Sequence, residues 1–171
     1  MKHDTLNINY AIYEDAVEKL GTTEATLPDV EFMSETVSGC GIGGEVEEII
    51  IGMISAMTTS LSFRTVCPAA VSLMEPRTHK IDLRVAQQQT DSKTGDIKTV
   101  AVKHILKIKP KKTGMGKVAV ASAGDVSGDY ATSYFATYID GKKLTEIDPY
   151  NFICMINGKD YLADVRKALG K

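Results

Sequence analysis

A two-residue alternation of apolar and polar side chains in the middle of the chain constrains the fold most strongly. Val100, Val102, Leu106 and Ile108 alternate there with Lys103, Lys107 and Lys109, a pattern typical of a half-buried strand. A strand from 97 to 109 would be roughly 40 Å long at ~3.3 Å per residue. Residues 81–89 also alternate in their first half, and the intervening DSKTGD (91–96) is rich in turn-forming residues. Together these segments predict a long hairpin.

Other stretches repeat the pattern. In MISAMTTSLSFRT (53–65), one side carries Met53, Met57, Leu61 and Phe63, and the other carries Thr58, Ser60, Ser62 and Arg64. YATSYFATYI (130–139) precedes Asp140-Gly141, and NFICMI (151–156) precedes Asn157-Gly158, both of them hairpin turn sequences. These patterns predict further strands.

Helical patterns are few. Pro68 followed by AAVSLME predicts a short helix with proline in its first turn, and LADVRKALG predicts a final helical turn or two that ends at Gly170. Residues 10–20 fit either a strand or the start of a helix. The predicted fold class is mainly β (α+β), with one helix of consequence.

Length and charge limit the functional classes. The 171 residues suit a single domain, 1–171, with residues 1–9 as a possible extended arm. Twenty basic and 22 acidic side chains give a net charge of −2, which argues against coating nucleic acid through bulk positive charge. Three scattered cysteines do not suit a disulfide framework. No apolar stretch approaches membrane-spanning length, so we expect no membrane anchoring.

Two motifs carry weak chemical signals. Residues 39–44 (GCGIGG) formally contain G-x-G-x-x-G, but a dinucleotide site needs a helix after it, and the β-prone EVEEIIIG follows instead. The run from Lys107 to Lys117 holds five lysines and no aromatic residue. A solvated strand end and loop explains this run better than a nucleic-acid site does.

No catalytic or metal-binding arrangement is evident. His3, His79 and His104 lack metal-ligand spacing, and no G-x-S-x-G motif occurs. Cys67 beside Pro68 has no visible partner histidine pattern. We therefore expect no enzyme activity, no cofactor and no metal.

The segment from Ile49 to Ile54 is strongly apolar and lies beside the flexible glycine loop. Together with the long hairpin, this segment presents more apolar surface and free strand edge than a lone small domain can cover. A ring of subunits that pools its strands into one wide barrel would cover these surfaces and remove free sheet edges.

Several segments resemble a known family. ATLPDVEFMSETVSGCGIGGEVE (25–47), LSFRT (61–65), TGDIKTVAVKHILKIKPKKTGMGK (94–117) and YFATYIDGKKLTEIDPYNFICMINGKDYLADVRKALG (134–170) are similar to the major tail tube protein of contractile-tailed, P2-like bacteriophages and phage-tail-like bacteriocins. The similarity runs from about Asn9 to Gly170. The Lys-only basic segment and the N-terminal MKHDTLNI depart from the family pattern.

This resemblance implies a β-sandwich or barrel-like domain with one packed helix and a long protruding loop or hairpin. It implies hexameric rings, stacked head to tail into a hollow tube inside a sheath, and residues 36–52 as an inter-subunit loop. The expected interface residues are Gly39, Gly41, Ile42, Gly43, Gly44, Glu45, Ile49, Ile50 and Ile51. Thr58, Ser60 and Ser62 are the candidates for lining the lumen.

The implied partners are further copies of the chain, the tail sheath, and baseplate and tape-measure proteins, with DNA passing through the lumen without specific binding. Assembly would take place in the bacterial host cytoplasm, giving a virion tail or tail-like particle. Two alternatives stay open, namely a type VI-like secretion tube protein and a nucleotide-binding enzyme that uses the glycine-rich loop.

Overall fold

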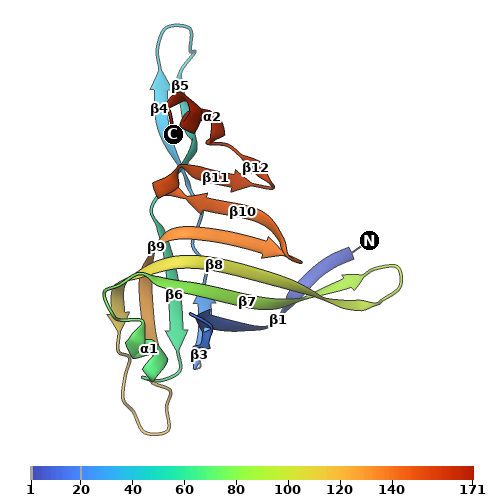
Figure 1. Ribbon diagram of the computed structural model, residues 1–171, viewed down its shortest axis with the longest axis vertical. Helices are drawn as coiled ribbons and strands as arrows, with labels where there is room; N and C mark the ends of the chain where they lie inside the picture. Colours follow the sequence, from blue (N-terminus) through green and yellow to red (C-terminus); the bar gives the residue numbers. More distant parts are fainter. Residues whose placement is uncertain (1, 20) are drawn as a thin grey trace.

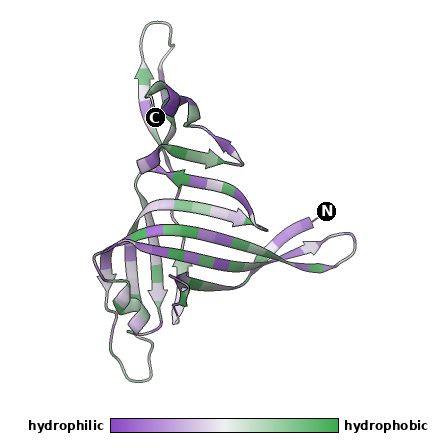
Figure 2. Cartoon of the chain, in the orientation of Figure 1, coloured by the Kyte–Doolittle hydropathy of each residue, from purple (hydrophilic) through white to green (hydrophobic). Residues whose placement is uncertain are grey.

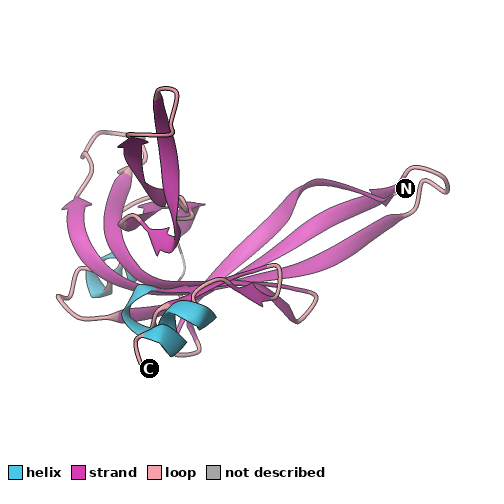
Figure 3. Cartoon of the chain, turned by 90° about the horizontal axis from the view of Figure 1, so that it is seen from above, coloured by secondary structure: helices cyan, strands magenta, loops and turns pink. Residues whose placement is uncertain are grey.

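The computed structural model of the protein describes residues 2–19 and 21–171 and consists mostly of antiparallel strands (Figures 1 and 3). The strands are β1 (Lys2–Glu14), β2 (Val17–Glu18), β3 (Thr22–Thr26), β4 (Phe32–Ser38), β5 (Glu45–Ile54), β6 (Met57–Phe63), β7 (His79–Asp91), β8 (Ile97–Gly114), β9 (Val126–Ile139), β10 (Lys142–Asp148), β11 (Ile153–Ile156) and β12 (Lys159–Asp160). The helices are α1 (Pro68–Ser72), the 3-10 turn η1 (Pro149–Asn151) and α2 (Ala163–Ala168). The predicted mainly β class is confirmed.

Strand β9 organises the large sheet by changing partners along its length. Its first half pairs with β6 on one edge and β8 on the other, whereas its second half pairs with β10 and β8. The main path runs β12-β11-β10-β9-β8-β7-β1-β2, and β3 joins through β6. The sheet is strongly curved (Figure 3), and the core includes side chains of β1, β6, β7, β8, β9, β10 and α1.

The alternation predicted for β6 is confirmed for Met57, Leu61 and Phe63, which are buried in this core. The placement of Met53 on the same side is wrong, because Met53 belongs to β5 and is exposed. The strand breaks after Ile54, where the backbone N–H of Ser55 donates a hydrogen bond to the carbonyl of Glu31. This break separates the alternation of β5 from that of β6.

The long hairpin is present as β7 and β8, with a continuous register from His79 opposite Ile108 to Thr90 opposite Ile97. β8 extends beyond the predicted end at 109, through Pro110 to Gly114. A register shift lies between Pro110 and Lys112, the kind of position where a strand tolerates proline. Part of the basic run is thus strand rather than loop.

The short turns follow their sequence signals. Asp140-Gly141 and Asn157-Gly158 all have positive φ, between 48° and 79°, as a tight two-residue hairpin turn requires. The helical option for residues 10–20 is wrong, since β1 continues to Glu14 and turns at Asp15 and Ala16, both with positive φ.

Both predicted helices form. Pro68 opens α1, the Cys67 thiol caps it by accepting from the N–H of Ala70, and Leu73 at its end is fully buried in the core. α2 begins after the buried Leu162. Of the two, α1 is the helix that packs into the main core.

Two parts of the chain project from this body. The first is the distal end of the ribbon formed by β1, β7 and β8, where Lys2 pairs with Asp91 beside the β7–β8 turn (Figure 3). Residues 2–9 therefore form a paired strand. The second is the β4–β5 hairpin, which forms a separate two-stranded sheet at one end of the longest axis (Figure 1).

A buried ion cluster holds β1, β7 and the segment after α1 together. His79 is fully buried, with Nδ1 2.5 Å from Glu14 Oε1 and Nε2 3.0 Å from the carbonyl oxygen of Glu75. The imidazole thus lies between a carboxylate and a carbonyl oxygen, both of which can accept hydrogen bonds. Lys19 Nζ lies 2.9 Å from Glu14 Oε2. Burial would raise the pKa of Glu14, but hydrogen bonds from Lys19 and His79 outweigh it and lower that pKa.

The Glu14→Gln variant should lose about 3 kcal/mol of unfolding free energy at pH 7, because the largely buried ammonium of Lys19 loses its counter-ion. The lowered pKa of Glu14 means that its contribution is present above the unfolded-state value of about 4.3 and is lost as pH falls through the folded-state value. In urea unfolding, the difference in unfolding free energy between wild type and Glu14→Gln should therefore become smaller below pH 4. The exposed Glu75→Gln is the control, and an equal loss in both variants would contradict this role of Glu14.

Gly52 fixes the base of the β4–β5 hairpin. Its φ is +68°, and a Cβ there would lie 2.5 Å from Cγ and Cδ2 of Leu162. The hairpin is thus held against the start of α2 at a position that only glycine fits.

Replacing Gly52 with alanine should lower the unfolding free energy by about 2 kcal/mol through backbone strain and overlap with Leu162. Gly44→Ala is the matched control, because nothing lies within 4 Å of a Cβ at the hairpin tip. Equal stabilities of the two variants in denaturant unfolding would show that Gly52 does not anchor the hairpin.

Candidate subunit interface

The predicted interface residues come together on the β4–β5 hairpin. Its tip carries Gly39, Gly41, Ile42, Gly43, Gly44 and Glu45, and β5 carries Ile49, Ile50 and Ile51; all nine are exposed. Residues 36–52, expected as an inter-subunit loop, span the end of β4, the tip and most of β5. The segment after the glycines is a strand, so the helix that a dinucleotide fingerprint requires does not follow them.

Both faces of this hairpin carry apolar side chains. Ile49 lies on one face, while Val46 lies on the other, opposite Val37 of β4. Ile50 and Ile51 follow where the register shifts and are exposed too, and Ile49 and Ile51 are each 61% exposed. A two-stranded sheet is marginally stable alone, and exposed apolar side chains on both faces are surface that a soluble monomer seldom displays.

The sequence interpretation missed the contribution of β4. Met33 and Val37 are exposed on the strand opposite the isoleucines, and their alternation in FMSETVS was the signal that could have found them. Figure 2 shows both hydrophobic and hydrophilic stretches on the hairpin at this end of the molecule.

The hairpin is also acidic. Glu35 and Glu48 are cross-strand partners, so two like charges face each other and destabilise the isolated hairpin. Among the hairpin glutamates Glu35, Glu45, Glu47 and Glu48, only Glu47 has a side-chain hydrogen bond within the described chain. It accepts this bond from Ser34 Oγ at 2.5 Å.

The lumen candidates lie on the outer face of β6, away from the core. Thr58, Ser60 and Ser62 alternate with buried residues, and Ser60 Oγ donates to Asp129 Oδ1 at 2.7 Å. This face is small and polar, but its role in a lumen stays a prediction.

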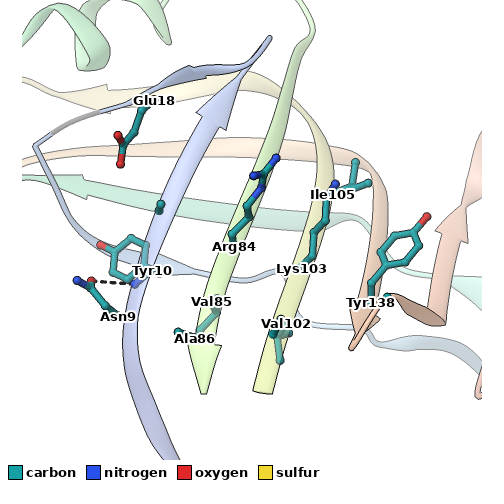
Figure 4. Close-up of a pocket in the computed structure, with 13 residues that line it drawn as sticks. Asn9, Tyr10, Glu18, Arg84, Val85, Ala86, Val102, Lys103, Ile105 and Tyr138 are labelled. Carbon is teal, nitrogen blue, oxygen red and sulfur yellow. Dashed lines mark hydrogen bonds between the residues drawn. The ribbon is translucent and has the colours of Figure 1, made fainter. Parts of the chain in front are cut away.

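An open hollow of about 830 Å³ lies across β1, β7, β8 and β9 (Figure 4). Its two cationic side chains, Arg84 and Lys103, both pair with Asp82, at 3.0 and 3.2 Å. Asn9 Oδ1 accepts from the N–H of Tyr10. Arg84 and Lys103 are thus both paired with Asp82, whereas the hydroxyl of Tyr10, which also lines the hollow, is buried without a hydrogen-bond partner among the described residues. Within residues 2–19 and 21–171, no group of three or more metal-ligating side chains is found.

Across the part of the chain that the structure covers, no helix is both long enough and apolar enough to span a membrane.

Comparison with known proteins identifies a family. The model of the family "Phage tail tube protein FII" matches residues 6–170. The tail tube protein of Escherichia phage P2 is 34% identical over 92 residues, which cover 53% of this chain and 51% of that protein. The match therefore spans about half the length of the phage P2 relative.

Two solved structures share the fold. One is the sheath/tube terminator of the extracellular contractile injection system PVC in its extended state, with a TM-score of 0.53 and 7% identity over 77% of this chain and 94% of that chain. The other is from the PVC sheath-tube complex, with a TM-score of 0.52 and 6% identity over 75% and 87% of the two chains. At such low identity the likeness concerns the fold alone. Because the family match runs almost from end to end, the chain belongs to the phage tail tube protein FII family.

Proposed function

We propose that this chain is the structural, non-catalytic subunit of a contractile tail tube, in which hexameric rings stack head to tail. The observation that carries the proposal is the β4–β5 hairpin, whose two faces both expose apolar side chains. A neighbouring copy on each face would cover these side chains. Membership of the tail tube family supports this reading.

The projecting ribbon of β1, β7 and β8 suits contacts within a ring. β1 has no described strand partner on its outer edge before Tyr13, and β8 has none on its outer edge before Val102. Free edges of this length invite pairing with another chain. Leu6, Ile8 and Ile97 are exposed on this ribbon and would be covered by such pairing.

The tube would enclose a lumen that conducts DNA or, in a headless particle, serves to puncture an envelope. We place Thr58, Ser60 and Ser62 at or near its wall, since a small and polar face makes no strong contact with phosphate. The net charge of −2 is compatible with passage of DNA without specific binding.

The proposed partners follow from this role. They are further copies of the chain, a tail sheath, and baseplate and tape-measure proteins, with assembly in the bacterial host cytoplasm. The similarity in fold to a chain from a sheath-tube complex supports the sheath as partner. A secretion tube of the type VI kind would use the same architecture. A nucleotide-binding enzyme is disfavoured by the strand that follows the glycines.

Ile50→Asp should abolish tubes while leaving the monomer folded, because Ile50 is 44% exposed in the single chain but would place an unpaired carboxylate in the contact. We expect the critical concentration for assembly to rise by more than about a hundredfold. Negative-stain microscopy and sedimentation measure this, with Ile50→Val as the apolar control. Normal tubes from Ile50→Asp would exclude this segment from the interface.

A cysteine at Thr58, in a Cys40→Ser background, tests the lumen. In assembled tubes a small maleimide should label it, whereas a maleimide carrying a bulky polymer should label it at least about tenfold more slowly than in the monomer. Equal labelling by the bulky reagent in tube and monomer would place the β6 face on the outside.

A further inference from the structure

Two elements at opposite ends of the longest axis carry opposite charge. The β4–β5 hairpin lies at one end, and the loop 115–125, between β8 and β9, lies at the other (Figure 1). Each end combines charged side chains with exposed apolar ones, which is the composition expected of a contact surface.

The hairpin carries only acidic charge. Residues 31–54 contain five glutamates, Glu31, Glu35, Glu45, Glu47 and Glu48, and no lysine or arginine occurs from 21 to 63. The basic side chains at this end belong to α2 and the C-terminal residues, beside the base of the hairpin (Figure 1). The facing pair Glu35 and Glu48 gains from any cation placed beside it. The hairpin therefore favours a basic partner.

The opposite end is basic. Five lysines and two aspartates give residues 107–129 a net charge of +3. Lys111, Lys112 and Lys117 are exposed near the end of β8 and in the loop. Lys117 forms an ion pair with Asp125 at 2.9 Å. Lys111 forms no ion pair within the described chain.

The basic end also exposes valine completely. Val118 and Val120 have relative accessibilities of 105% and 99%, and Met115 of the same loop is 49% exposed. Side chains this apolar gain free energy when covered, at about 25 cal/mol per Å². Nothing in the described chain covers them, so the loop has an apolar centre with lysines close by.

We propose that the β4–β5 hairpin of one copy docks on the 115–125 loop and the adjoining end of β8 of a second copy in the next ring. Its glutamates meet Lys111, Lys112 and Lys117, and its exposed valine and isoleucine side chains cover Val118 and Val120. Because the two surfaces differ and lie at opposite ends of one molecule, the contact is heterologous and open-ended, and it repeats along an axis. This inference rests on the proposed tube function and names the surface that receives the hairpin.

A charge-reversal cycle tests the pairing. Lys111→Glu and Glu47→Lys should each raise the critical concentration for tube growth about tenfold or more while single rings persist, because like charges then meet across the ring junction. The double variant should restore growth to within about threefold of wild type. Lys142→Glu, an exposed site away from both ends, is the matched control, and thermal unfolding of every variant should match wild type.

The native Cys40 provides a second measurement, because it is exposed at the hairpin tip whereas Cys154 is buried. With Ala119→Cys introduced in the loop, a flexible bis-maleimide should link assembled tubes into a ladder of dimers and higher multimers. Replacing Cys40 with serine should remove the ladder.

The outcomes separate the two proposals. If wild type forms tubes and Lys111→Glu forms them at the same concentration, or if no ladder appears in tubes, the docking is wrong and the loop faces another component such as the sheath. Loss of rings as well as tubes in Lys111→Glu would also overturn it, since the contact would then lie within a ring. If wild type forms no ordered assembly, the tube function itself fails.

Discussion

The pairing of β8 with β7 on one edge and β9 on the other holds the described molecule together. Both registers run for most of the length of β8, and its alternate side chains Leu106 and Ile108 are buried in the core. The same alternation continues toward both ends of the ribbon, where the core no longer covers it. The strands that build the domain therefore also carry surface beyond it, and neighbouring copies are the means of covering that surface.

Local patterns predicted the elements better than the breaks between them. The turns at Asp140-Gly141 and Asn157-Gly158 and the helix at Pro68 depend on residues adjacent in sequence, so the sequence alone sufficed. Met53 belongs to β5 rather than to the alternation of β6, and the break between these strands lies where Ser55 forms a hydrogen bond with Glu31, in a segment that it meets only in the fold. The Glu14–His79 pair joins residues 65 positions apart, and no local pattern marks it.

Only part of the candidate interface could be predicted, again because some of its residues are marked by local sequence and others are not. The isoleucines at 49–51 and the glycine loop stand out in the sequence itself, whereas the contribution of Val37 depends on its cross-strand pairing with Val46. No local pattern marks Val118 and Val120, and only the structure shows that both side chains are fully exposed. The acidic hairpin and the basic end of β8 suggest a contact only once the fold places them at opposite ends of one axis (Figure 1).

The central claim is that this chain functions as a repeating unit in a tube. Cryo-electron microscopy of wild-type protein, assembled at high concentration, tests it most directly. The account predicts stacked rings in which each β4–β5 hairpin is buried between copies and its apolar side chains are covered on both faces. A homogeneous monomer at every concentration and salt, or an assembly that leaves the hairpin in solvent, would contradict it.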